Sequence, residues 1–303
     1  MILVTGAEGL IGRHLCARLE AEGLEVRRFD LRRSPDEDIR NRASLAAALK
    51  GVRGVIQLAA VSRVVWAERD PALCQATNVD ALSGLTSLCL ETARPWMIFA
   101  SSREVYGHPD RLPVGEDHPL RPVNAYARSK RDGEEIVRAA SDAGLVANIC
   151  RFSNVYGCPL DHADRVVMAF AAAAAHGGVM SVEGSGNVFD FTAVSDAVDG
   201  LWRLVQASIA GERLPPVHFV TGQGTSLGEL AGIAAARALG EVEIKAAPTR
   251  DFDVSSFIGD PARAEQLLGW TARADLGTEM ARLIAALAAP TARDRLSEPT
   301  ALQ

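Results

Sequence analysis

The chain has 303 residues, of which 48% are hydrophobic and 23% charged, and its net charge is −6. This is the composition of an ordinary globular protein, and an acidic balance without a basic patch excludes nucleic acid as an expected partner. No apolar run reaches the roughly 18 residues of a membrane span. The five cysteines are odd in number and not closely paired. We therefore expect a cytoplasmic protein with no membrane partner, and no pattern predicts a metal site.

The chain opens with an apolar strand that runs into three glycines, Gly6, Gly9 and Gly12, followed by an apolar helix. A strand that ends in glycines and opens a helix leaves backbone N–H groups free at the positive end of the helix, where a pyrophosphate binds. Gly6 permits the tight turn, Gly9 lets the phosphates approach, and Gly12 lets the helix pack on the strand. We therefore predict a dinucleotide site.

A second predicted strand, residues 24–29, ends at Asp30. A carboxylate at this point can accept hydrogen bonds from both ribose hydroxyls of an adenosine. Arg32 and Arg33 follow and could meet a 2′-phosphate, but Asp30 would repel that phosphate. The sequence therefore favours NAD over NADP as the cofactor.

Strands and helices alternate through the first half of the chain. The further strands are predicted at 54–60, 96–100 and 145–151, and the helices at 43–49, 71–93 and 125–140. Continuous apolar strands that alternate with helices predict an α/β fold, a doubly wound parallel sheet of Rossmann type. Ligands then bind at the carboxyl ends of the strands.

From about residue 154 the alternation weakens and shorter segments predict a smaller C-terminal α/β substrate-binding cap. Helices are expected at 166–175, 195–207 and 226–239, and residues 217–220 are expected to return to the main sheet. We predict an NAD-binding domain, an interleaved cap and a flexible tail, with the boundaries 1–157 (with returning segments near 189–207 and 216–221), 158–288 and 289–303.

Tyr126 and Lys130 stand four residues apart in a predicted helix and share one face. A nearby ammonium lowers the pKa of a phenol, which makes Tyr126 a candidate general base. Ser102 lies at the end of a predicted strand that precedes this helix. A hydroxyl, a phenol and a lysine beside a nicotinamide are the groups that hydride transfer at a secondary alcohol requires.

Several motifs stand in order along the chain. They are the glycine loop, Asp38-Ile39-Arg40, Leu58-Ala59-Ala60, Asn78-Val79, residues 101–107 (Ser-Ser-Arg-Glu-Val-Tyr-Gly), Tyr126 with Lys130, residues 151–157 (Arg-Phe-Ser-Asn-Val-Tyr-Gly), and Asp260-Pro261 ahead of Leu268-Gly269-Trp270. With these motifs the chain resembles, over residues 1–288, the NAD-dependent epimerase/dehydratase family of extended short-chain dehydrogenases/reductases, which act on nucleotide sugars.

The resemblance implies a role for each matching position. Asp38 and Ile39 would lie at the adenine, Ala59 and Ala60 at the pyrophosphate and ribose, and Lys130 at the nicotinamide ribose. The complete set of expected cofactor-binding residues is Gly6, Gly9, Leu10, Ile11, Gly12, Asp30, Arg32, Asp38, Ile39, Leu58, Ala59, Ala60, Asn78, Ser101, Tyr126 and Lys130.

The resemblance also implies the substrate contacts. Ser102 would hydrogen-bond the sugar hydroxyl whose proton Tyr126 takes, while Asn154 and Arg250 would bind the diphosphate. Arginine suits that role because its planar guanidinium can donate two parallel hydrogen bonds to phosphate oxygens. One position departs from the family, since Phe189 stands where an arginine is common. The neighbouring Asp190, like Asp196, is expected to hold backbone near the site.

Positions 103 and 104 discriminate between reactions of the family. Its dehydratases carry an acid and then a glutamate after the hydroxyl residue, but here Arg103 replaces the acid while Glu104 remains. Arginine holds its proton too tightly to act as a general acid, although Arg103 could bind a substrate carboxylate. We therefore favour a nucleotide-sugar 4-epimerase that works through a 4-keto intermediate, with Ser102, Tyr126 and Lys130 as its catalytic groups.

The alternatives are a dehydratase or uronic-acid decarboxylase that uses Glu104 catalytically, a nucleotide-sugar reductase, and a dinucleotide-sensing protein without turnover. The resemblance further implies a homodimer paired through residues 71–93 and 125–140. The apolar residues of these helices could equally belong to the core beneath them.

Overall fold

The structure is a computed structural model that describes residues 1–248 and 254–289. Its larger lobe is built on a parallel sheet in the order β10-β5-β4-β3-β1-β2. These strands are β1 (Ile2–Thr5), β2 (Val26–Phe29), β3 (Gly54–Gln57), β4 (Trp96–Ser102), β5 (Ala147–Phe152) and β10 (Val217–Phe219). The predicted doubly wound sheet is confirmed, and so is the distant strand at 217–220.

Helices cover both faces of this sheet because successive strand residues point to opposite sides. Val4 and Ile98 pack on one face, beneath α1 and α8, while Leu3 and Met97 pack on the other, with α2, α5 and α6. The helices of the larger lobe are α1 (Leu10–Ala21), α2 (Arg42–Ala48), α3 (Val64–Arg69), α4 (Pro71–Gln75), α5 (Ala81–Glu91), α6 (Ala125–Asp142), α8 (Val194–Ile209) and α10 (Ala262–Leu268).

The helix predicted over residues 71–93 differs in detail from the observed segment. It comprises α4, a π-helical turn η1 (Ala76–Asp80) and α5. Single π turns inside helices are rare and frequent at functional sites, and here the turn contains Asn78. Helix α3, which precedes α4, was not predicted.

The smaller lobe has a hydrophobic core of its own, which includes Phe170, Leu230 and Leu283. Its helices are α7 (Val166–His176), α9 (Leu227–Ala235) and α11 (Leu276–Ala288), and its strands are β6 (Asn154–Tyr156), β7 (Gly178–Glu183), β8 (Val188–Phe189), β9 (Phe191–Ala193), β11 (Thr225–Ser226), β12 (Val242–Ala247) and β13 (Ser256–Phe257). The predicted helix 226–239 ends early, at Ala235.

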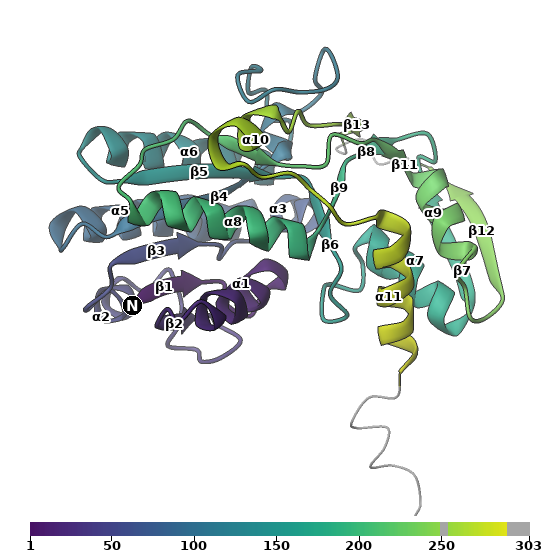
Figure 1. The fold of residues 1–303 in the computed structure, drawn as a ribbon, viewed down its shortest axis with the longest axis horizontal. Helices are drawn as coiled ribbons and strands as arrows, with labels where there is room; N and C mark the ends of the chain where they lie inside the picture. The colour runs from purple at the N-terminus through teal and green to yellow at the C-terminus, as the bar shows by residue number, and fades with distance from the viewer. Residues whose placement is uncertain (249–253, 290–303) are drawn as a thin grey trace, which may run out of the picture.

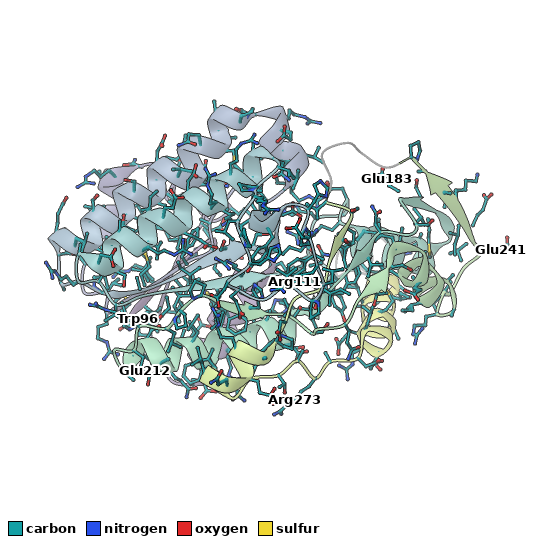
Figure 2. All side chains as sticks on the ribbon, turned by 90° about the horizontal axis from the view of Figure 1, so that it is seen from above. Trp96, Arg111, Glu183, Glu212, Glu241 and Arg273 are labelled. Atoms are coloured by element: carbon teal, nitrogen blue, oxygen red, sulfur yellow. The ribbon has the colours of Figure 1, made fainter. Side chains whose placement is uncertain are left out.

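The sheet strands run toward the smaller lobe (Figure 1). Trp96, at the start of β4, lies at the end of the molecule away from that lobe, whereas Glu183 and Glu241 lie within it (Figure 2). The carboxyl ends of the strands therefore face the smaller lobe, and a ligand site is expected between the two. Within residues 1–248 and 254–289, none of the helices has both the length and the apolar character needed to cross a membrane.

Candidate active site

A cavity of about 690 Å³ lies where the carboxyl ends of the strands meet the smaller lobe. The predicted site residues that line it are Gly6, Gly9, Leu10, Ile11, Gly12, Asp30, Arg32, Ile39, Leu58, Ala59, Ala60, Ser101, Ser102, Arg103, Glu104, Tyr126, Lys130 and Asn154. Two predicted cofactor residues, Asp38 and Asn78, do not line it, and Arg250 lies outside the described residues.

The glycine loop is shaped by contacts that leave no room for side chains. Gly6 has φ +68°, and a Cβ there would lie 2.6 Å from the backbone nitrogen of Ala59. A Cβ on Gly12 would lie 2.1 Å from the carbonyl oxygen of Gly6. Gly9 begins α1 without a side-chain cap, so the first N–H groups of the helix are available to an anion. This cradle fits a pyrophosphate.

Asp30 lies at the end of β2, where its carboxylate also organises the loops around it. One carboxylate oxygen accepts a hydrogen bond from the Glu8 N–H at 2.9 Å and the other from the Arg32 N–H at 2.8 Å. A carboxylate has further lone pairs for a ribose hydroxyl. Glu37 accepts a hydrogen bond from the Asp30 N–H and also lines the cavity, so two acids flank this position, which disfavours a 2′-phosphate.

Asn78 does not line the cavity but holds the loop that forms its wall. Its side chain accepts a hydrogen bond from the Val61 N–H at 2.8 Å and donates to the Val61 carbonyl at 3.1 Å and to Ser129 at 2.9 Å. It thus fixes the loop after β3 to α6. Asp38 instead holds the guanidinium of Arg40 through both carboxylate oxygens, and this ion pair lowers the pKa of Asp38.

The predicted catalytic residues come together at the end of β4. Asn124 caps α6 by accepting a hydrogen bond from the Ala127 N–H, which starts the helix just before Tyr126. The hydroxyl of Ser102 lies beside the phenol of Tyr126 and lowers its pKa. Lys130 is buried, and its Nζ donates to the Ala100 carbonyl at 2.8 Å. A hydroxyl, a phenol and an ammonium therefore share one wall of the cavity.

The acidities of these groups differ from the sequence-based prediction. Burial raises the pKa of Tyr126 to about 12; the hydrogen bond with Ser102 lowers it and the charge of Glu104 raises it. Burial lowers the pKa of Lys130 from 10.5 to about 8. The prediction that Lys130 makes the phenol acidic is wrong for the chain alone, because Nζ points to Ala100 and lies 5.8 Å from the centre of the Tyr126 ring.

Arg103 and Glu104 form the 3-10 turn η2 (Arg103–Tyr106), and their side chains pair inside the cavity. Nη2 of Arg103 lies 2.9 Å from one carboxylate oxygen of Glu104. The other oxygen accepts a hydrogen bond from Asn124 at 3.1 Å. Both oxygens of Glu104 thus have partners.

Two further aspartates support the site as predicted. Asp190 is fully buried, and its carboxylate accepts hydrogen bonds from the backbone N–H groups of Thr221 and Gly222 at 2.9 and 2.8 Å. Asp196 accepts from the N–H groups of Arg273 and Ala274. The prediction that both hold backbone is confirmed, and Asp190 also orients the strand next to Asn154, since its carbonyl accepts the Asn154 N–H.

Several cavity residues were not singled out from the sequence. They are Glu37, Arg63, Trp66, Thr77, His162 and Arg165. Arg63 donates to Asp164 of the smaller lobe at 2.8 Å, across 101 residues of sequence. The only signal for Arg63 was its place just after a predicted strand, where a loop residue faces the ligand edge. The described residues contain no group of three or more His, Cys, Asp or Glu side chains placed to hold a metal ion.

A parallel sheet with a glycine-loop cradle and a serine, tyrosine and lysine in one cavity define a dinucleotide-dependent enzyme of Rossmann type. The sequence pattern of the NAD dependent epimerase/dehydratase family matches residues 2–218. The chain belongs to this family, and its cofactor is NAD.

Individual relatives carry different activities. A UDP-glucose 4-epimerase of Rhizobium meliloti (strain 1021) is 29% identical over 91% of this chain and 93% of its own length. The solved structure of MoeE5 with UDP-glucose and NAD is 30% identical, with TM-score 0.87 over 98% of this chain and 99% of that one, and MoeE5 is also solved with UDP-glucuronic acid and NAD. DesIV, a dTDP-glucose 4,6-dehydratase from Streptomyces venezuelae, is 25% identical, with TM-score 0.84 over 94% and 96%.

Proposed function

We propose that the chain is a nucleotide-sugar 4-epimerase. The observation that carries the proposal is the composition of one cavity wall: Ser102, Tyr126 and Lys130 are present, while the position of the dehydratase acid holds Arg103. The resemblance of the chain to a UDP-glucose 4-epimerase over nine-tenths of both lengths supports the same reaction. The substrate is a hexose linked to a nucleoside diphosphate.

Ser102, Tyr126 and Lys130 have different roles in the proposed reaction. Ser102 donates a hydrogen bond to the 4-hydroxyl oxygen, and the phenolate of Tyr126 takes the hydroxyl proton. Bound NAD supplies the hydride acceptor, and its positively charged ring favours the phenolate form of a nearby tyrosine. Lys130 orients the ribose. Once the 4-keto sugar has presented its other face, Tyr126 would return the proton to the oxygen while C4 takes back the hydride from the reduced nicotinamide, so that C4 is inverted without net oxidation.

The alternative reaction classes use Glu104. Its carboxylate lines the cavity, so a dehydratase or decarboxylase remains the second candidate. However, both of its oxygens are held, by Arg103 and Asn124, and elimination of water would have no acid at position 103 to protonate the leaving hydroxyl. A panel of nucleotide sugars followed by mass spectrometry and NMR tests the proposal. An unchanged mass with inverted C4 supports it, whereas loss of water or of CO₂ contradicts it.

The variant Glu104→Gln sharpens this test. The amide keeps the size of the side chain, and an epimerase does not need a base at this position. The amide oxygen can still accept from one of the two donors, Arg103 or Asn124, and the other loses its acceptor, so we expect turnover to fall by about tenfold or less. A loss of several hundredfold in turnover, with the NAD affinity intact, would identify Glu104 as a base and the reaction as elimination or decarboxylation.

A further inference from the structure

Arg103 is held in the cavity by partners that leave part of its guanidinium free. The side chain is 11% exposed, and Nη2 pairs with Glu104. The guanidinium carbon stands 4.6 Å from the ring centre of Phe189 and 5.9 Å from that of Phe257. Nη1 is buried and has no hydrogen-bond partner. Aromatic faces attract a cation but do not replace an oxygen acceptor.

Arg103 of the larger lobe and Phe189 of the smaller lobe meet in the cavity. The structure places the cation of Arg103 directly against the Phe189 ring. Phe189 and Phe257 are paired neighbours of β8 and β13, so the smaller lobe offers Arg103 an apolar surface that keeps water away from it.

Other cationic side chains line the cavity as well. Lys130 donates to the Ala100 carbonyl and Arg32 to the Glu8 carbonyl. Arg63 and Arg165 pair with Asp164 and Asp161, although Nε of each is also buried without a hydrogen-bond partner. What distinguishes Arg103 among them is its place directly after Ser102. A buried N–H of a charged group without an acceptor destabilises the protein, because the group has lost its hydration without gaining a partner. A ligand oxygen that approaches Nη1 of Arg103 removes this cost, and an anionic oxygen gains roughly twice as much as a neutral one.

The position of Arg103 restricts which ligand group can reach it. It directly follows Ser102, which lies beside Tyr126, and these two residues act on C4 in the proposed function. We therefore expect Arg103 to meet a group on C3 or C5, the two neighbours of C4, and of these only C5 can carry a carboxylate in a common hexose derivative. A hexose nucleotide has its diphosphate on C1, whereas the C6 carboxylate of a uronic acid is attached to C5, a neighbour of C4.

We propose that Arg103 is a specificity-determining residue that binds the C6 carboxylate of a nucleotide-linked uronic acid. This inference rests on the proposed function for the identity of the reacting carbon. Nη1 donates to the carboxylate while Nη2 stays with Glu104, and the rings of Phe189 and Phe257 hold the fork in place. MoeE5 is solved with both UDP-glucuronic acid and UDP-glucose, so the fold admits either sugar and the preference must come from side chains such as this one.

The test compares UDP-glucuronic acid with UDP-glucose, which differ only at C6. Calorimetric titration is done on the NAD-loaded protein in the Tyr126→Phe background, which is expected to bind the sugars without converting them. The titration should show tighter binding of the uronic acid by about 10- to 100-fold, the value of one charged hydrogen bond. Arg103→Gln should bring this ratio close to one, and Arg103→Lys should leave an intermediate ratio. Arg42→Gln, which removes an exposed arginine paired with Glu91 on the surface, is the matched control and should keep the native ratio.

Three results would overturn the inference: no preference of the native protein for the uronic acid, no binding of either compound, or an equal loss of both in Arg103→Gln, which would indicate a diphosphate contact. Because binding is measured without turnover, the outcome is separate from that of the proposed function. Preferred binding of the uronic acid with release of CO₂ would keep the carboxylate site and reject the epimerase. Inversion of C4 in UDP-glucose without any preference for the uronic acid would support the epimerase and reject the carboxylate site.

Discussion

At the residue scale, the chemistry depends on groups whose acidity the fold sets in opposite directions. Tyr126 is a phenol with its pKa raised to about 12, and Lys130 an ammonium with its pKa lowered to about 8. Both shifts have burial as their largest cause, because a dry environment penalises a phenolate and an ammonium alike. The chain alone therefore holds the tyrosine in its neutral form, and the positive charge of the nicotinamide would favour its ionisation when NAD is bound.

Tyr126→Phe removes the proton acceptor and little else. The ring keeps its place on α6, so we expect loss of at least about a thousandfold in turnover, of the order found for general acid–base catalysis, with nearly native NAD affinity. Steady-state kinetics and fluorescence titration with NAD measure the two effects. Loss of NAD binding in this variant would show that the hydroxyl has a structural role.

Lys130 gives the protein a stability that rises with alkaline pH. Its folded-state pKa of about 8 lies below the unfolded value of 10.5, so between these two the unfolded chain binds more protons and the free energy of unfolding increases with pH. Relative to Lys130→Met, the native protein should gain about 2 kcal/mol between about pH 7 and 9.5. Denaturant unfolding at several pH values measures the difference, and a flat difference would contradict the burial of a charged Lys130.

At the element scale, a buried polar network joins the segments that present the catalytic groups. Arg151 on β5 donates to both carboxylate oxygens of Glu134 on α6, at 2.7 Å each, and to the hydroxyl of Tyr106 in η2. That hydroxyl is also hydrogen-bonded to His218 on β10. Burial lowers the pKa of His218 to about 3, so the imidazole is neutral. The network fixes η2 against α6 and thereby Ser102 against Tyr126.

Arg151→Met should destabilise the protein by about 3–5 kcal/mol, because it leaves the carboxylate of Glu134 buried without its main partner. We expect the lower end of that range, because Arg138 remains paired with Glu134 at 2.7 Å and still offsets its charge. The double variant Arg151→Met with Glu134→Leu removes both charges and should recover most of the loss. Urea unfolding measures all three proteins, and an equally unstable double variant would show that packing dominates over the charge.

At the scale of the whole molecule, the sequence predicted those features whose signals are local. The glycine loop, the pair Tyr126 and Lys130, and the apolar strands each lie within a short segment whose periodicity or spacing is readable. Contacts such as Arg103 with Phe189, or Arg63 with Asp164, depend on how loops of the two lobes meet, and no local pattern encodes that. The division of the chain at residue 157 into an NAD-binding domain and a cap stays a prediction, as does the role of Arg250.

The predicted homodimer also belongs to this scale. Leu82, Leu85 and Leu88 of α5 are buried against the sheet, so these apolar residues belong to the core and do not form a subunit interface. The outward side of α5 instead carries Ser83, Gly84 and Ser87, and small residues allow a helix of another chain to approach closely. We therefore propose pairing through the outward sides of α5 and α6.

Gly84 provides a sharp test of this pairing, because a Cβ placed there meets no atom within 4 Å. Gly84→Arg should leave the single chain folded, with a melting temperature at or above that of the native protein, since glycine costs up to about 1 kcal/mol inside a helix. In a helix-to-helix interface the same side chain would collide with the partner. Light scattering should give twice the 32.2 kDa chain mass for the native protein and the single mass for the variant. A native protein that is monomeric at micromolar concentration would reject the dimer, and a variant that stays dimeric would move the interface elsewhere.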